Sequence, residues 1–183
     1  MKKWLREYLS FALMVVGLFA ARSSLADHYL VPSGSMERTL LPGDRVVVDK
    51  QAYGLRLPFT LIKLGQGVAP ARGDVVVFDS PADGTRLIKR IVAVGGDVVE
   101  VRGGRALVNG RPEDRAAQVD LRFGGGPDVA PTQIPAGKVL VLGDSRGNSN
   151  DGRFFGLVPE RELYARAVRV YYRSDAGFVW LPL

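Results

Sequence analysis

Residues 85–96 read TRLIKRIVAVGG, a run of branched apolar residues that ends at a Gly-Gly turn signal. This composition is typical of a buried β-strand. Further runs of the same kind lie between Gly, Pro, Asn and Asp along the chain: RVVVDK (45–50), GDVVVFDSP (73–81), DVVEVRGGRALVNGRP (97–112), GKVLVLGD (137–144) and RAVRVYYR (166–173). The pattern predicts an all-β fold, a domain of antiparallel sheets.

The run 97–112 carries two tight-turn signals, Gly103-Gly104 and Asn109-Gly110, which predict a hairpin or a meander. Residues 113–136 lack a clear periodicity, so we expect a long loop there. Together these features predict a small inserted β/loop region over about 103–136. Beyond the N-terminal segment no helical period survives, apart from a turn over 158–165.

The composition limits the class of protein. The 183 residues suffice for one modest domain and a short appendage. The chain has no cysteine and a single histidine, so we expect no disulfide, no metal site and no cofactor. The net charge of +6 comes mostly from scattered arginines, which suit a surface near an anionic lipid bilayer. We expect no nucleic-acid partner.

The N-terminal segment places Lys2, Lys3 and Arg6 before an apolar run that extends from Tyr8 to Ala21. Positive charge of this kind stays on the cytoplasmic side of a membrane. The segment predicts a cytoplasmic N-terminus over 1–7, one transmembrane helix as an anchor over 8–26, and an extracytoplasmic catalytic domain over 27–183. The predicted location is the cytoplasmic (inner) membrane, with the domain on the periplasmic side.

A removable secretory signal is the alternative interpretation of this segment. Ser24-Leu25-Ala26 ends like a small-residue cleavage site. Arg22, which lies between the apolar run and that site, favours the retained anchor. A helix over 7–21 would be about 22 Å long, short of the roughly 30 Å hydrocarbon core. Both interpretations carry the rest of the chain across the membrane.

The stretch HYLVPSGSMERTL (28–40) presents two serines, Ser33 and Ser35, in a turn rich in Pro and Gly. A serine is a weak nucleophile unless a base accepts its proton. The only histidine, His28, lies close to the predicted membrane surface, and we expect it to be an interfacial residue rather than a catalytic base.

Lys89 is the other candidate base. Strand alternation places Leu87, Ile91 and Ala93 on the same face as Lys89. Such neighbours disfavour the charged amine, and a pKa lowered from about 10.4 to about 8 would correspond to roughly 3 kcal/mol. The alternative is a strand lysine that reaches solvent or pairs with a carboxylate. Periodicity alone leaves both open. Lys50 and Lys138 are expected to be surface lysines at strand edges.

Five motifs follow one another along the chain: PSGSM (32–36), TLLPGD (39–44), RGDVVVF (72–78), KRIVAVGGD (89–97) and GDSRGNSNDGRFFGLVP (143–159). This series resembles that of the type I signal peptidases, or leader peptidases, which are membrane-anchored serine proteases with a Ser/Lys dyad. The resemblance extends from the N-terminal segment to about residue 173. It implies a serine endopeptidase that removes N-terminal signal peptides from exported preproteins by cutting after small residues.

The resemblance also implies residue roles. Ser35 matches the nucleophile and Lys89 the general base. Ser33 matches a hydroxyl that joins the Ser35 backbone N–H in an oxyanion hole.

In the last motif, Ser149 matches a hydroxyl that orients the lysine amine. Asp151 and Arg153 match a supporting ion pair, and Gly143-Asp144 matches the turn that opens this loop.

Three residues depart from the family pattern. Arg38 stands where the family usually has proline, and Gly147 and Gly152 stand where Asp and Ser are commoner. None of them is a dyad residue.

The substrate, a signal peptide, is expected to add as an extended strand between HYLVP and TRLIK. The residues expected to contact it are Tyr29, Leu30, Val31, Pro32, Thr85, Arg86, Leu87 and Ile88. Two alternatives remain: a conjugation- or maturation-type peptidase with one specific substrate, and a non-enzymatic membrane-tethered β-domain.

Overall fold

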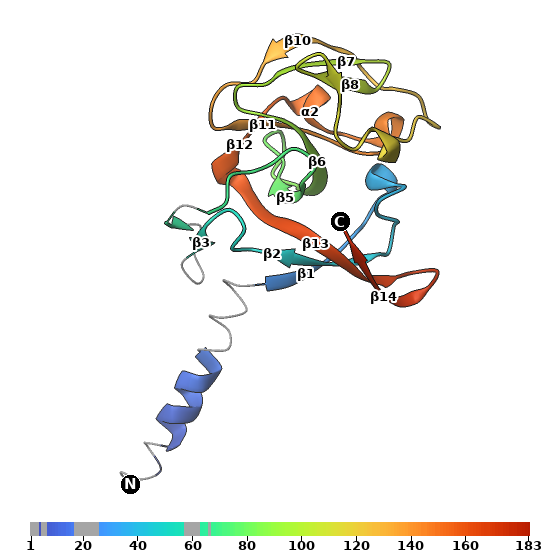
Figure 1. The fold of residues 1–183 in the computed structure, drawn as a ribbon. Coiled ribbons are helices and arrows are strands. Elements are labelled where there is room, and N and C mark those ends of the chain that lie inside the picture. The colour runs from blue at the N-terminus through green and yellow to red at the C-terminus, as the bar shows by residue number, and fades with distance from the viewer. Residues whose placement is uncertain (1–3, 5–6, 17–25, 57–62, 66) are drawn as a thin grey trace.

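The structure is a computed structural model, and it describes residues 4, 7–16, 26–56, 63–65 and 67–183 (Figure 1). Residues 7–16 are helical. Within the described ranges, no helix has both the length and the apolar character needed to cross a membrane. Of the anchor expected over 8–26, residues 17–25 lie outside the described residues. Ala26, its expected last residue, is the first residue of a strand.

The main body of the fold is an 8-stranded antiparallel sheet in the order β1-β2-β13-β5-β6-β11-β12, with β14 paired to β13. The strands are β1 (Ala26–Leu30), β2 (Arg45–Asp49), β5 (Val75–Asp79), β6 (Arg86–Val94), β11 (Lys138–Leu142), β12 (Val158–Pro159), β13 (Leu163–Arg173) and β14 (Gly177–Pro182). The apolar runs at 45–50, 73–81, 85–96, 137–144 and 166–173 all lie in it. The prediction of antiparallel sheets is confirmed.

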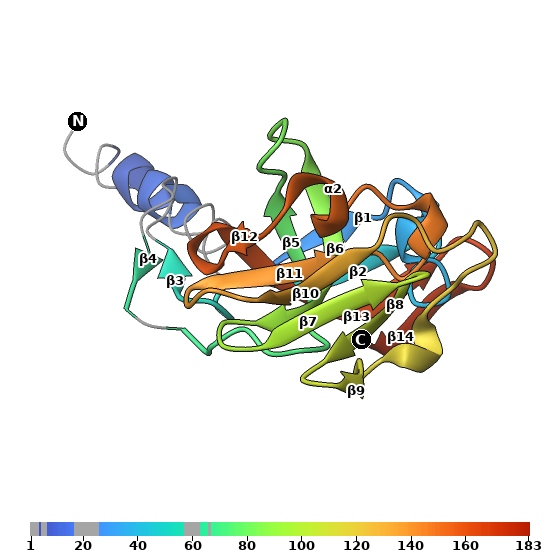
Figure 2. The ribbon, with the colours of Figure 1, turned by 90° about the horizontal axis from the view of Figure 1, so that it is seen from above.

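A second sheet has the order β10-β7-β8-β9 and lies beside the first (Figures 1 and 2). Its strands are β7 (Val98–Arg102), β8 (Arg105–Val108), β9 (Arg111–Pro112) and β10 (Val129–Gln133). The two predicted turns join β7 to β8 and β8 to β9. Asn109 and Gly110 both have positive φ, as a tight hairpin turn requires.

The loop expected over 113–136 is only partly a loop, because β10 pairs there with β7. The residues of β10 after its first are exposed, so this edge strand carries no apolar pattern that could have revealed it.

Short elements complete the fold. They are β3 (Leu55–Arg56), which pairs with β4 (Lys63–Leu64); the 3₁₀ helices η1 (Gly34–Met36), η2 (Ala116–Gln118), η3 (Arg146–Asn148) and η4 (Glu160–Glu162); and α2 (Gly152–Phe155). The turn expected over 158–165 is η4, flanked by β12 and the start of β13.

Strand β6 lies where three apolar clusters meet. Ile88 packs in a cluster with residues of β2, β5 and β13, Ile91 in a second cluster with β5 and β11, and Ala93 in a third with the smaller sheet. The expectation that Ala93 shares the face of Lys89 is therefore wrong. The register of β6 against β11 shifts between Ile91 and Ala93, and this irregularity turns Ala93 to the other face.

Candidate active site

The turn that carries Ser35 is held at both ends by buried residues. Before it, Val31 is buried, its N–H donates to the Asp44 carbonyl (2.9 Å), and its own carbonyl accepts from Gly43 N (2.9 Å). After it, Met36 is fully buried in the first cluster. The chain between these anchors forms η1, and Ser35 is itself buried, at 6% exposure. Two apolar anchors therefore fix the position of one serine.

Lys89 reaches this serine from the middle of β6. Lys89 Nζ lies 2.6 Å from Ser35 Oγ, and the two residues are 54 positions apart in the sequence. The lysine is 3% exposed. The expectation of a lysine held in an apolar strand environment is confirmed. The alternative of a solvent-reaching side chain is wrong for this residue.

The surroundings of Lys89 favour a neutral amine. Burial lowers the pKa of Lys89 from 10.5 to about 8, and the charges of Asp151 and Asp144 oppose part of this effect. Each of these carboxylates is also bound by a guanidinium, Asp151 by Arg153 and Asp144 by Arg90. Loss of hydration is therefore the dominant cause of the lowered pKa of Lys89. A buried amine with such a pKa can accept a proton near neutral pH.

Ser33 lies beside the same hydroxyl. Its Oγ is 3.4 Å from Ser35 Oγ, longer than an ordinary O–H···O hydrogen bond. Ser33 is exposed, whereas Ser35 is buried. Ser33 thus stands at the mouth of the site with a hydroxyl that is free to turn toward a bound group.

The loop after β11 is organised by the expected pair Asp151–Arg153. Arg153 Nε lies 2.8 Å from Asp151 Oδ1, and both side chains are fully buried. Asp151 also accepts from Gly143 N (2.9 Å) and caps α2 by accepting from Arg153 N. Arg153 donates to the Arg146 carbonyl (2.6 Å). One carboxylate therefore joins both ends of the loop.

Ser149 does not make the contact expected of it. Its Oγ is buried and has no hydrogen-bond partner in the described part of the chain, so its hydroxyl does not bind the Lys89 amine here. Ser149 is nevertheless close to the turn that carries Ser35. A Cβ built on Gly143 would overlap Ser149 Oγ and lie 2.5 Å from the Ser35 carbonyl oxygen. Gly143 is thus the spacer that lets Ser149 and Ser35 approach.

A buried network that the sequence did not reveal surrounds this centre. Arg90, next to Lys89, binds Asp144 through Nε–Oδ1 (2.9 Å) and Nη2–Oδ2 (2.8 Å). Thr39 donates to Asp144 Oδ2 (2.5 Å) and accepts from Arg90 (2.9 Å). These contacts join the turn after Ser35, strand β6 and the loop after β11. Arg90, Asp144 and Thr39 all lie in the motifs named above. Arg90 and Asp144 are 54 positions apart in the sequence, and Thr39 and Asp144 are 105 apart.

The residues expected to contact substrate lie on two strand edges. Among the described residues, β1 pairs only with β2 and β11 pairs with β6 only at Arg90–Val94, so 86–89 have no strand partner on that side in this part of the chain. Tyr29 Oη donates to the Arg86 carbonyl (3.2 Å) and so links the two edges. Leu30, Pro32, Thr85 and Arg86 are exposed, Tyr29 and Leu87 are half-buried, and Val31 and Ile88 are buried.

Three other basic residues considered as candidates, His28, Lys50 and Lys138, lie outside this centre. His28 is exposed, with Nδ1 3.7 Å from Asp27 Oδ1, and it lines a hollow in which neither Ser35 nor Lys89 takes part. The expectation for Lys50 is wrong: it is 5% exposed and forms an ion pair with Asp27 (3.0 Å). Lys138 is exposed, as expected.

The departures from the family pattern have structural counterparts. Arg38 has φ +80°, which a proline ring cannot adopt. A Cβ at Gly147 would overlap the Phe123 carbonyl, and one at Gly152 would lie 2.9 Å from the Val141 carbonyl oxygen. Both glycines are therefore required by close backbone approaches, which exclude the commoner Asp and Ser.

Several known proteins are similar to this chain. A family model described as signal peptidase, peptidase S26, matches residues 1–172. A signal peptidase I from Leptolyngbya laminosa is 34% identical over 157 residues, 85% of this chain and 73% of that protein. A probable signal peptidase I-2 from Synechocystis is 34% identical over 167 residues, 90% of this chain and 71% of the relative. A crystal structure of a signal peptidase I from Enterococcus faecalis is 31% identical and covers 53% of this chain and 95% of its own, with a TM-score of 0.44.

Proposed function

This chain belongs to the signal peptidase family, peptidase S26, and we infer that it is a serine endopeptidase that removes N-terminal signal peptides from preproteins. The observation that carries the mechanism is the buried 2.6 Å contact between Lys89 Nζ and Ser35 Oγ. The membership favours an enzyme over a β-domain that only binds partners.

In the proposed mechanism, neutral Lys89 accepts the Ser35 proton as Ser35 Oγ attacks the carbonyl carbon of the residue before the cut. The resulting lysine ammonium gives its proton to the leaving amine when the peptide bond breaks. An acyl-enzyme remains on Ser35 Oγ. Lys89 then takes a proton from a water molecule, which attacks the ester carbonyl; the bond to Ser35 Oγ breaks, Lys89 returns the proton to Ser35 Oγ, and the signal peptide leaves as a carboxylic acid. Lys89 thus acts as base and acid in turn.

The neighbouring residues take supporting roles. Ser33 and the Ser35 backbone N–H donate to the oxyanion. Asp151 and Arg153 hold the loop after β11, which keeps Ser149 beside the Ser35 carbonyl. Ser149 is proposed as a positioning residue, because its buried hydroxyl has no partner among the described residues and the family pattern assigns it to orient the Lys89 amine.

The substrate adds as a strand between β1 and the unpaired part of β6, because both edges offer backbone donors and acceptors. Val31 and Ile88 belong to the same apolar cluster and form the wall under this strand. This apolar wall is proposed to favour small side chains near the cut.

Cleavage of a model preprotein by the purified full chain tests this function. We expect one new N-terminus, directly after a small residue, as read by mass spectrometry. Preprotein that stays intact at equimolar enzyme, between pH 7 and 9, would refute the proposal. A panel of unrelated leaders separates a general signal peptidase, which cuts many of them, from a maturation-type peptidase, which cuts one.

Substitution of Ser33 by alanine should weaken cleavage without abolishing it. Loss of one oxyanion donor lowers kcat by about 10²- to 10³-fold in other serine proteases. Because Ser33 is exposed, its replacement should leave the unfolding midpoint unchanged. Steady-state kinetics on a peptide substrate checks this, with Ser33→Thr as the variant that keeps a hydroxyl. Equal kcat in Ser33→Ala and wild type would remove Ser33 from the mechanism.

The enzyme is proposed to be anchored in the cytoplasmic membrane, with residues 1–7 in the cytoplasm, the anchor over 8–26 and the catalytic domain over 27–183 outside. The lysines and the arginine before the apolar run support this orientation. Ala26, the last residue of the proposed anchor, is also the first residue of β1.

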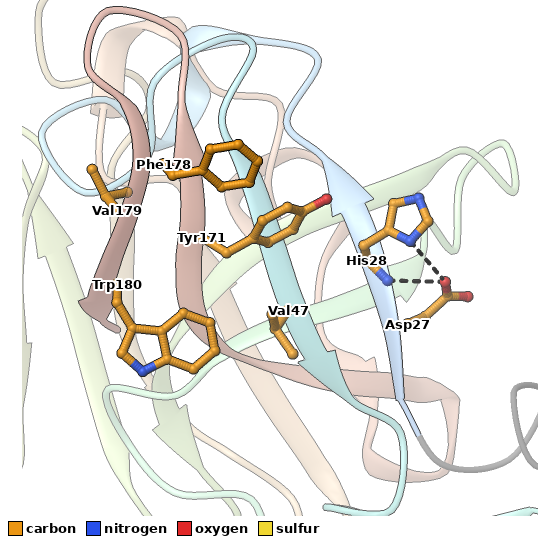
Figure 3. A pocket seen from close by; sticks show the side chains of 7 residues that line it. All are labelled: Asp27, His28, Val47, Tyr171, Phe178, Val179 and Trp180. Carbon is orange, nitrogen blue, oxygen red and sulfur yellow. Dashed lines mark hydrogen bonds and ion pairs between the residues drawn. The ribbon is translucent and has the colours of Figure 1, made fainter.

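An aromatic hollow at the start of β1 supports contact with lipid (Figure 3). It has a volume of about 540 Å³ and is lined by Asp27, His28, Val47, Tyr171, Phe178, Val179 and Trp180. Phe178 is 86% and Trp180 64% exposed, and the Arg169 guanidinium lies 5.3 Å from the Trp180 ring centre. Aromatic rings and arginine side chains suit the headgroup region of a bilayer. This face is proposed to rest on the membrane from which the anchor emerges.

The location of Trp180 in lipid can be measured by fluorescence. In a Trp4→Phe variant reconstituted in vesicles, Trp180 is the only tryptophan, and brominated lipids should quench it. The double variant Phe178→Ser and Val179→Ser should reduce this quenching, since the apolar part of the face is lost. A Trp180 signal that brominated lipid does not quench would contradict membrane contact of this face.

A further inference from the structure

The unpaired edge of β6 presents the backbone groups of alternate residues. The Thr85 carbonyl accepts from Ser80 N (2.8 Å), and Ile91 N donates to the Asp74 carbonyl (2.8 Å), so the odd-numbered residues direct their backbone toward the side of β5. Backbone groups of successive strand residues point to opposite sides. The N–H and C=O groups of Arg86 and Ile88 therefore face the open edge.

The facing edge of β1 follows the same rule. Val31 directs its N–H and its carbonyl toward the β2 side, where they bond Asp44 and Gly43. His28 and Leu30 therefore direct theirs to the open edge. His28 N–H there binds the side chain of Asp27 (2.9 Å) rather than another strand. A peptide strand between the two edges would meet acceptors at Arg86 and Ile88 on one side and at Leu30 on the other.

One of these acceptors is already occupied. The Tyr29 hydroxyl donates to the Arg86 carbonyl (3.2 Å), where a substrate N–H would have to bond. Burial raises the pKa of Tyr29, so the phenol remains a donor at any physiological pH. The Ile88 carbonyl lies one residue from Lys89, and Arg86 lies two residues, or about 7 Å, farther from the reacting centre.

The position of Arg86 is itself supported. Its guanidinium binds Asp79 through two contacts (2.8 and 3.1 Å) and lies 4.2 Å from the centre of the Tyr164 ring. The Tyr29 hydroxyl therefore joins β1 to β6 at Arg86, a residue whose guanidinium is held by Asp79 and Tyr164. It is a defined feature of the free site.

We propose that the Tyr29 hydroxyl is a specificity-determining group that occupies the Arg86 carbonyl in the free enzyme and yields it to the main chain of the substrate. This proposal rests on the proposed function. A peptide that ends before Arg86 leaves the Tyr29 contact intact. A longer peptide has to displace the Tyr29 hydroxyl, which reduces the affinity that main-chain hydrogen bonds contribute. Substrate choice then depends more strongly on the side chains near the cut.

The substitution Tyr29→Phe removes only the hydroxyl. Substrates are a peptide series extended one residue at a time upstream of the cut, from two residues to seven. For the short peptides, KM and kcat should equal those of wild type. Once the peptide reaches Arg86, KM should fall by about two- to tenfold with kcat unchanged, the scale of one net hydrogen bond. Tyr164→Phe, which removes a hydroxyl from the same cluster but not from the Arg86 carbonyl, should show no dependence on length.

The outcomes separate the two proposals. A wild-type enzyme that cuts neither the peptides nor the model preprotein overturns the proposed function. A wild-type enzyme that cuts them, with Tyr29→Phe identical to it at every length, overturns only the inference. So does an equal change at all lengths, which indicates a purely structural role. A KM that rises for long peptides would show that the hydroxyl binds substrate instead of competing with it.

Discussion

Substitution of Ser35 by alanine should lower kcat for preprotein cleavage by roughly 10⁶-fold, the scale seen when other serine proteases lose their nucleophile. The fold should survive, because among the described residues the Ser35 hydroxyl binds Lys89 Nζ and lies 3.4 Å from Ser33 Oγ, while the buried Val31 and Met36 anchor the turn. Cleavage kinetics and circular dichroism on the same preparation check both expectations.

Ser145→Ala is the matched control for Ser35→Ala. Ser145 is also buried and lies beside the nucleophile, since its backbone N–H donates to the Ser35 carbonyl (3.1 Å). Its hydroxyl has no hydrogen-bond partner among the described residues, so its removal should leave kcat within about threefold of wild type. Residual activity of Ser35→Ala at the level of this control would place the nucleophile elsewhere.

The second large effect concerns the protonation of Lys89. With a pKa of about 8, the amine is about one-tenth neutral at pH 7 and mostly neutral at pH 9. kcat/KM should therefore rise nearly tenfold per pH unit below pH 7 and level off above pH 8. Lys89→Arg should be inactive at every pH, because a guanidinium does not deprotonate in proteins. Activity that stays flat between pH 6 and 9 would contradict the role of Lys89 as the base.

The lowered pKa of Lys89 also leads to a prediction about the stability of the fold. The folded pKa of Lys89 lies below its unfolded value, so unfolding takes up a proton between pH 8 and 10.5 and stability rises with pH across that window. Below pH 8 the full penalty, about 3 kcal/mol, remains. Lys89→Met should therefore abolish activity yet raise the free energy of unfolding by about 2–3 kcal/mol at pH 7, with the gain fading toward pH 10.5. A Lys89→Met variant less stable than wild type at pH 7 would show that the buried amine is not destabilising.

Strand prediction succeeded where strands are buried and failed where they are exposed. Most residues of β5 and of β6 are buried, and their branched apolar runs indicate these strands in the sequence. β10 is almost wholly exposed, and it is held by backbone pairing with β7 rather than by burial. Backbone pairing places few demands on residue type apart from proline, so an exposed edge strand of this kind carries no apolar pattern in the sequence. The prediction for the face of Ala93 was wrong for a related reason. The register shift that turns Ala93 depends on the pairing of β6 with β11, which the sequence of one strand does not show.

The family and the antiparallel β-fold can be predicted from the sequence, because ordered motifs and apolar runs are local properties of the chain. The surroundings of Ser35 and Lys89 follow from the tertiary structure. Ser35 and Lys89 meet across 54 positions, Arg90, Asp144 and Thr39 form their network across up to 105, and the Tyr29 hydroxyl reaches the Arg86 carbonyl across 57. Desolvation and hydrogen bonding depend on distances in space, which motif order does not encode. The lowered pKa of Lys89 therefore belongs to the fold.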